Sequence, residues 1–232
     1  MIIETFITSP FQQNTRVVAC ETTERAICID PGDSESAPEI ADFLSKNNLE
    51  LQAIALTHGH LDHIGGVSAL SKIFPQAEIV LHRDDEDLYY ALPQQPIFMG
   101  LQPHQLKALG MDYEDPPRLA RNWQNGEIYA VGKLNFKVLH CPGHTRGHVV
   151  FVEEREKKIF GGDCLFQGSI GRTDLLGGNF EQLIASIENK ILSLGDDFTV
   201  YTGHGAETTV GRERRTNPFL TGVYQVSSGR FV

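Results

Sequence analysis

The sequence predicts a single α/β domain in which sheets are covered by helices. Short β-branched runs between turn residues alternate with segments whose apolar residues recur at helical spacing, the pattern of a layered α/β sheet. Hydrophobic residues make up 41% of the 232-residue chain, which is enough for a sizeable core. No linker or internal repeat divides the sequence, so we expect one domain over residues 1–232.

The first third of the chain alternates between strand and helix patterns. Ser36 and Pro38 are typical of the cap and first turn of a helix, which we expect to end near residues 47–48. Ile64, Val67 and Leu70 fall at helical spacing. They predict a helix over residues 63–74. Strands are predicted at residues 2–8, 15–20, 26–30, 51–56 and 78–81.

The remaining two thirds contain predicted hairpins, a helix and an irregular segment. The acidic run at residues 84–87 is typical of the first turn of a helix, where the helix dipole favours acids. Residues 91–117 are rich in proline, and we expect them to form a partly helical cover that walls a pocket. The basic cluster at residues 212–215 is expected on a terminal helix or at a pocket rim. Further strands are predicted at residues 127–131, 134–140, 149–152, 158–161 and 198–201, and a helix at residues 179–194.

The most specific motif follows the apolar run at residues 51–56. It places His58, His60, Asp62 and His63 within six residues. Imidazole suits zinc, iron and other transition ions, and a carboxylate completes the ligand set. A turn after the strand would direct His58 and His60 to one position, and the start of a helix would direct Asp62 and His63 to a second position. This pattern favours two neighbouring metal ions over a histidine-rich surface turn.

Further candidate ligands follow later predicted strands. His144, Asp163 and His204 each lie in a glycine-rich turn at a strand end, where a rigid sheet can hold catalytic groups on loops. We expect His140 to lie near the site without binding metal. The other histidines that we do not assign as ligands are His82, His104 and His148.

These motifs, in this order, resemble the metallo-β-lactamase superfamily. The resemblance to its short, single-domain glyoxalase II-like hydrolases extends over essentially the whole chain, since it includes residues 140–145, 171–174, 194–197 and 217–220. The family implies a four-layer αβ/βα sandwich with a dinuclear site at one edge of the two sheets. It also implies one metal held by His58, His60 and His144, a second held by Asp62, His63 and His204, and Asp163 as the bridge.

The implied chemistry is hydrolysis. Two dications that share a water lower its pKa towards about 7, so that a bridging hydroxide can attack a carbonyl without a separate catalytic base. A thiolate leaves unaided, whereas an amide nitrogen must first be protonated. We therefore expect hydrolysis of small-molecule acyl thioesters, of the hydroxyacylglutathione (S-lactoylglutathione) type, with two zinc ions, or iron or manganese instead. Arg172 suits a substrate carboxylate, or it forms a salt bridge with Asp174.

Three other functions remain as alternatives. A persulfide dioxygenase of the same superfamily would use one iron, held by two histidines and a carboxylate. A nuclease conflicts with the formal charge of −10, because nucleic-acid binding normally needs a basic surface. A non-enzymatic metal-binding protein would not need seven ligands in catalytic order. The absence of a secretory or membrane-spanning pattern and of a disulfide framework predicts a cytoplasmic protein.

Overall fold

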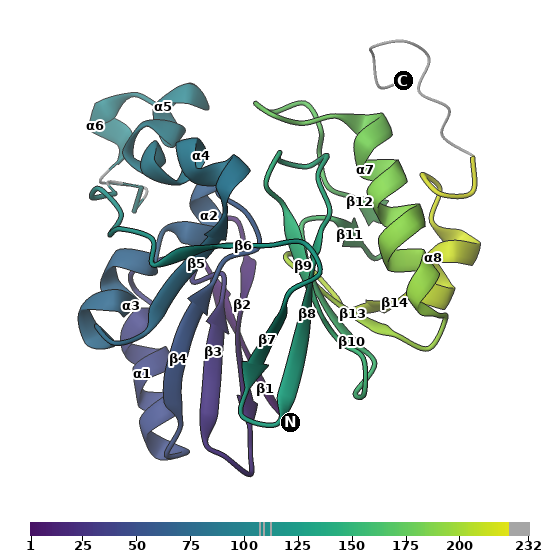
Figure 1. The fold of residues 1–232 in the computed structure, drawn as a ribbon. Coiled ribbons are helices and arrows are strands. Elements are labelled where there is room, and N and C mark those ends of the chain that lie inside the picture. Colours follow the sequence, from purple (N-terminus) through teal and green to yellow (C-terminus); the bar gives the residue numbers. More distant parts are fainter. Residues whose placement is uncertain (107, 109, 112, 223–232) are drawn as a thin grey trace.

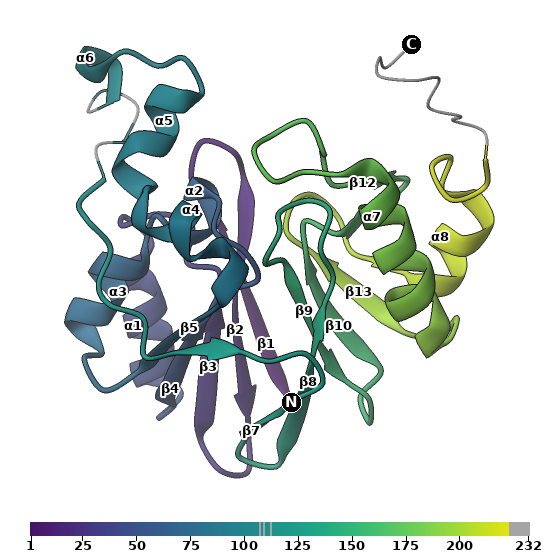
Figure 2. The ribbon, with the colours of Figure 1, turned by 45° about the horizontal axis from the view of Figure 1, so that its top comes forward.

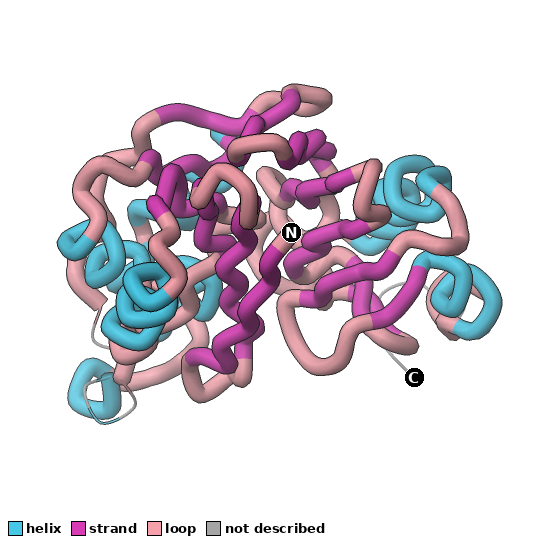
Figure 3. Tube along the Cα trace, turned by 90° about the horizontal axis from the view of Figure 1, so that it is seen from below, coloured by secondary structure: helices cyan, strands magenta, loops and turns pink. Residues whose placement is uncertain are grey.

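The structure is a computed structural model that describes residues 1–106, 108, 110–111 and 113–222. Two six-stranded sheets lie face to face in its centre, and helices cover the outer face of each (Figures 1 and 3). The predicted four-layer αβ/βα sandwich is therefore confirmed. The last ten residues of the predicted domain, 223–232, lie outside the described residues.

The first sheet follows the chain in simple order. Its strands β1 to β3 pair antiparallel, and β3 to β6 pair parallel. The strands are β1 (Ile2–Thr8), β2 (Gln13–Cys20), β3 (Arg25–Ile29), β4 (Glu50–Ala55), β5 (Glu78–His82) and β6 (Arg121–Trp123). The helices on this side are α1 (Ala37–Lys46), α2 (Leu61–Ile64), α3 (Val67–Ile73), α4 (Glu86–Tyr90), α5 (Gln95–Phe98) and α6 (Pro103–Leu106), with 3₁₀ turns at Arg83–Asp85 and Leu92–Gln94.

The second sheet has the order β14-β13-β10-β9-β8-β7. Its strands are β7 (Ile128–Val131), β8 (Leu134–His140), β9 (Val149–Glu153), β10 (Lys158–Gly162), β13 (Thr199–Thr202) and β14 (Thr208–Thr209). The outer helices are α7 (Phe180–Ser186), continued by a π-helical turn at Ile187–Ile191 and a 3₁₀ turn at Leu192–Leu194, and α8 (Val210–Thr216), which carries the basic cluster. A small ribbon, β11 (Leu165–Phe166) with β12 (Ser169–Ile170), lies beside this sheet (Figures 1 and 2).

Three apolar interfaces hold the four layers together. In β2, Val17 packs towards the helices and its neighbour Val18 packs between the sheets, because successive strand side chains point to opposite faces. In β9, Phe151 likewise packs between the sheets and Val150 packs towards α7. Burying each such side chain stabilises the fold by about 1.5–3 kcal/mol. All four sit at 1% exposure or less.

The predicted helix over residues 63–74 is wrong in one respect, because it is interrupted between α2 and α3. The amide of Gly66 donates to the carbonyl of Pro31, and a Cβ at Gly66 would lie 2.2 Å from the Asp33 carbonyl oxygen. This close approach redirects the chain at the interruption. Ser36 is the cap of α1 and a proline lies in its first turn, as predicted, but Ser36 makes no side-chain cap bond and its amide donates to Asp33. In the described part of the chain, no helix is long and apolar enough to span a membrane.

Candidate metal centre

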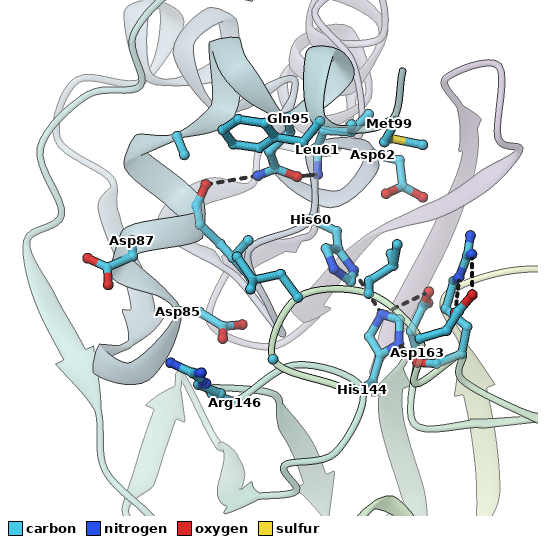
Figure 4. A pocket seen from close by; sticks show the side chains of 18 of the residues that line it. His60, Leu61, Asp62, Asp85, Asp87, Gln95, Met99, His144, Arg146 and Asp163 are labelled. Atoms are coloured by element: carbon cyan, nitrogen blue, oxygen red, sulfur yellow. Dashed lines mark hydrogen bonds and ion pairs between the residues drawn. The ribbon is translucent and has the colours of Figure 1, made fainter. Parts of the chain in front are cut away.

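The seven predicted ligands meet at one end of the sandwich. Each follows the end of a strand: β4 leads to the turn with His58 and His60, and α2 then presents Asp62 and His63. The loop between β8 and β9 carries His144, β10 ends before Asp163, and β13 ends before His204. Figure 4 shows His60, Asp62, His144 and Asp163 converging on one pocket.

His58, His60 and His144 form the first ligand group. Nε2 of His144 lies 2.9 Å from Nδ1 of His60 and 3.2 Å from Nε2 of His58. Two nitrogens bound to one tetrahedral zinc ion are about 3.3 Å apart. The three nitrogens are therefore close to the spacing that a single ion requires.

Asp62, His63 and His204 form the second group. Oδ2 of Asp62 lies 3.1 Å from Nε2 of His204 and 3.8 Å from Nε2 of His63. This mixture of one carboxylate and two imidazoles suits zinc, iron and manganese.

Asp163 lies between the two groups. Its Oδ2 is 3.6 Å from Nε2 of His144 in the first group and 3.5 Å from Nε2 of His204 in the second. Its Oδ1 faces Nε2 of His63 at 3.3 Å. A Cβ at position 203 would lie 2.1 Å from this Oδ1, so Gly203 is needed for the carboxylate to occupy its place.

Two buried atoms indicate that the residues fit metal ions. Nε2 of His63 and Oδ1 of Asp163 are buried and have no hydrogen-bond partner. Such groups are costly to bury unless something satisfies them. A cation between the two ligand groups would do so, and these donor atoms suit that role.

Four of the ligand histidines are also bonded to the protein through the second ring nitrogen, as expected for metal-binding histidines. Nδ1 of His63 lies 2.9 Å from Oδ2 of Asp30, which also accepts from the hydroxyl of Thr57. Asp30 is close enough to His58 and His63 to resemble a third ligand group, but these bonds make it an orienting residue. The other outer bonds join Nδ1 of His58 to the Thr57 hydroxyl at 3.0 Å, Nδ1 of His144 to the Arg172 carbonyl at 2.8 Å, and Nδ1 of His204 to the Phe11 carbonyl at 3.0 Å.

Burial lowers the pKa of histidines in both groups, and the carboxylates Asp163 and Asp62 reverse this effect in the second group. It lowers the pKa of His58 and His144 and, together with the neighbouring His144, lowers that of His60 to about 3. These rings are neutral and keep a free lone pair for a metal. At His63 burial opposes the charged form, but Asp163 and Asp62 outweigh it and raise the pKa. Nearby histidines, His63 foremost, hold the pKa of Asp163 low against the effect of burial.

Asp85 is a site residue that sequence reasoning missed. The acidic run does begin a helix, as predicted, but Asp85 is fully buried. It accepts hydrogen bonds from the amides of Gly59 and Gly147 and from the hydroxyl of Thr145. Burial raises the pKa of its carboxyl. No local sequence signal distinguishes it from the exposed Asp84 and Asp87.

The irregular segment over residues 91–117 forms part of a pocket wall, as expected. Gln95 fixes it to the metal-binding turn: its Nε2 donates to the Gly59 carbonyl at 2.7 Å, and its Oε1 accepts from the Leu61 amide at 2.9 Å. The pocket has a volume of about 610 Å³ and is lined by ligands of both groups.

Arg172 forms the ion pair with Asp174 that was one of its two expected contacts. Its side chain lines the pocket, and its guanidinium makes a two-point ion pair with Asp174, at 2.7 and 2.8 Å. Arg146 also lines the pocket, and sequence reasoning missed it. Among the described residues, its guanidinium has no acidic partner within ion-pair distance.

The histidines that were not assigned as ligands lie apart from both groups or face a protein partner. His82 and His140 stack with ring centroids 4.1 Å apart and planes only 10° apart, so a single ion cannot lie in both ring planes. Nε2 of His140 lies 2.8 Å from the Arg146 carbonyl. His148 is buried, and its Nε2 accepts from the Asp163 amide. His104 is exposed on α6.

The family comparison agrees with this geometry. Residues 8–204 match the family model described as the metallo-beta-lactamase superfamily. The chain belongs to this superfamily. All seven candidate ligands of the metallo-beta-lactamase-like site lie within the matched residues.

Relatives and solved structures of the superfamily match along almost the whole chain. A protein of Haemophilus influenzae named hydroxyacylglutathione hydrolase GloC is 40% identical over 220 residues, which cover 95% of this chain and 98% of GloC. The crystal structure of the B3 metallo-beta-lactamase BLEG-1 is similar with a TM-score of 0.82 and 35% identity, covering 95% of this chain and all of BLEG-1. The crystal structure of TTHA1623 in a di-iron-bound form is similar with a TM-score of 0.80 and 36% identity, covering 94% of this chain and 100% of the TTHA1623 chain.

Proposed function

We propose that the protein is a metal-dependent hydrolase of acyl thioesters of the hydroxyacylglutathione type. The observation that carries the proposal is the position of Asp163 within 3.6 Å of ligand nitrogens in both groups, as a bridging carboxylate requires. The 40% identity to a hydroxyacylglutathione hydrolase supports the substrate class.

The chain would hold two divalent ions, one on each ligand group, with zinc as our choice and iron or manganese as alternatives. Two bound dications supply an activated water and polarise the substrate carbonyl. The protein's own part is to position the ligands. Asp30 fixes the ring of His63, and the Arg172 carbonyl fixes the ring of His144. Gln95 and Asp85 hold the metal-binding turn against the pocket walls.

A thioester suits this pocket better than an amide because a thiolate leaves without protonation. Arg172 and Arg146 are the cationic side chains that line the pocket, and in this proposal they face the charged part of the substrate. The four cysteines are buried and free, which fits the reducing cytoplasm in which we place the enzyme. The formal charge of −10 argues against a nucleic-acid substrate.

The test combines metal analysis with turnover. We expect close to two transition-metal ions per chain and hydrolysis of S-lactoylglutathione, followed by loss of its thioester absorbance. Oxygen uptake with glutathione persulfide and hydrolysis of a β-lactam should both be negligible. One tightly held iron together with oxygen uptake would replace the proposal with the dioxygenase, and β-lactam turnover without thioester turnover would replace it with a lactamase.

A further inference from the structure

The pocket beside the metal ligands has an apolar rim. Nine large apolar side chains are exposed among the described residues, and four of them line this one pocket. Phe98 and Leu176 are 74% and 75% exposed, and Met99 and Phe11 are 47% and 36% exposed. Large apolar side chains that gather around a binding site, rather than being scattered singly, mark a surface that a ligand covers.

The rim is fixed to the metal-binding turns. Gln95, which bonds Gly59 and Leu61, is the first residue of α5, and Phe98 is the last. On another side, the Phe11 carbonyl accepts from Nδ1 of His204, a ligand of the second group. Phe98 and Phe11 are therefore held at a set distance from the reacting centre, as a substrate-binding surface requires.

Acidic and basic residues also line the pocket, and two of them, Asp87 and Arg146, lie apart from Met99 on the rim (Figure 4). Figure 4 shows Asp87 and Arg146 on one side of His60 and His144, and Met99 on the other. A charged thiol carrier such as glutathione, with one ammonium group and two carboxylates, matches acidic and basic side chains together. The apolar rim then remains for the other half of a thioester, which is the acyl group.

We propose that the rim selects thioesters whose acyl group carries an apolar chain longer than that of lactate. The preferred substrates are thus 2-hydroxyacyl thioesters with extended or branched hydrocarbon chains. This inference rests on the proposed thioester hydrolysis and names the part of the substrate that Phe98 and Leu176 recognise.

The experiment measures kcat/KM for glutathione thioesters of glycolate, lactate, 2-hydroxybutanoate and 2-hydroxyhexanoate. A fully buried methylene contributes a factor of about four, and one half-covered on an open rim contributes about two. Over the four added methylenes the 2-hydroxyhexanoyl ester should exceed the glycoloyl ester by roughly tenfold or more. Equal or falling values along the series would overturn the inference and leave thioester hydrolysis intact. If the protein hydrolyses none of the esters, both this inference and the proposed thioester hydrolysis are wrong.

Matched variants locate the effect. Phe98→Ser and Leu176→Ser should reduce the ratio of kcat/KM between the 2-hydroxyhexanoyl and glycoloyl esters to within about twofold of unity. A general loss of activity lowers kcat/KM for both esters equally and therefore cancels in this ratio. Ile128→Ser is the control, because Ile128 is 57% exposed on β7 and does not line the pocket. It should keep the wild-type ratio. If the rim variants keep this ratio but change the molar mass in light scattering, the rim is an interface between copies of the chain and the inference is wrong.

Discussion

The buried carboxylate of Asp85 accepts a hydrogen bond from the backbone amide of Gly147, with 2.6 Å between Oδ1 and N. Its other oxygen accepts from the Gly59 amide at 3.0 Å and from the Thr145 hydroxyl at 2.6 Å. One side chain thus ties the turn that carries the first two histidine ligands to the loop that carries the third. These two segments come from different sheets, so Asp85 connects the halves of the sandwich at the metal centre.

Asp85→Ala should lower the free energy of unfolding by about 3 kcal/mol or more. Hydrogen bonds to an ionised acceptor contribute about 1.5–3 kcal/mol each, and three donors would be left unsatisfied. Urea unfolding of the purified protein measures the change. Asp87→Ala is the control, since Asp87 is an exposed carboxylate two residues along, and its effect should stay within about 0.5 kcal/mol. Similar effects of the two substitutions would show that the Asp85 bonds do not hold the loops.

Asp163→Ala should reduce the metal content from close to two ions per chain to one or fewer and lower kcat more than a hundredfold. The reason is that Asp163 contacts ligands of both groups, and even outer residues of metal sites contribute ten- to a hundredfold. Elemental analysis and thioester kinetics check both effects. His104→Ala, on exposed α6, should change neither. The bridging role would be wrong if the Asp163 variant kept two ions.

Removal of the metals with a chelator should lower the melting temperature by about 5–10 °C. An ion present at a hundred times its Kd stabilises the folded state by about 2.7 kcal/mol, and each kcal/mol shifts the midpoint of a chain of this size by about 2–4 °C. Differential scanning calorimetry with and without added zinc measures this shift. In Asp163→Ala the same treatment should have a smaller effect, and an equal shift in both proteins would argue against metal binding at this centre.

Arg172→Ala should raise KM for S-lactoylglutathione by no more than about fivefold, with kcat nearly unchanged. A contact remote from the reacting carbon contributes equally in the ground and transition states. The ion pair with Asp174 is exposed, and such a pair contributes less than about 1 kcal/mol, so it leaves Arg172 able to turn to a substrate carboxylate. Asp174→Ala frees the guanidinium and should lower KM. Steady-state kinetics decide the matter, and a collapse of kcat in Arg172→Ala would place this residue in the chemical step instead.

The sequence by itself determined the layered fold and the candidate ligands. Both are local signals: short β-branched runs alternate with segments of helical spacing, and His58 to His63 follow an apolar strand directly. The order of the motifs, through family resemblance, also indicated how the ligands divide into two groups, and the distances around Asp163 agree with that division.

Only the tertiary structure decided which other side chains serve the site. Asp85 looks like its exposed neighbours in sequence, and its partners Gly59 and Gly147 lie 26 and 62 residues away. The sequence alone does not mark Gln95 or Arg146 as site residues either, because their positions at the pocket depend on how the two sheets pack. The roles of such residues come from burial and from contacts across the sandwich, and neither exists in a short stretch of chain.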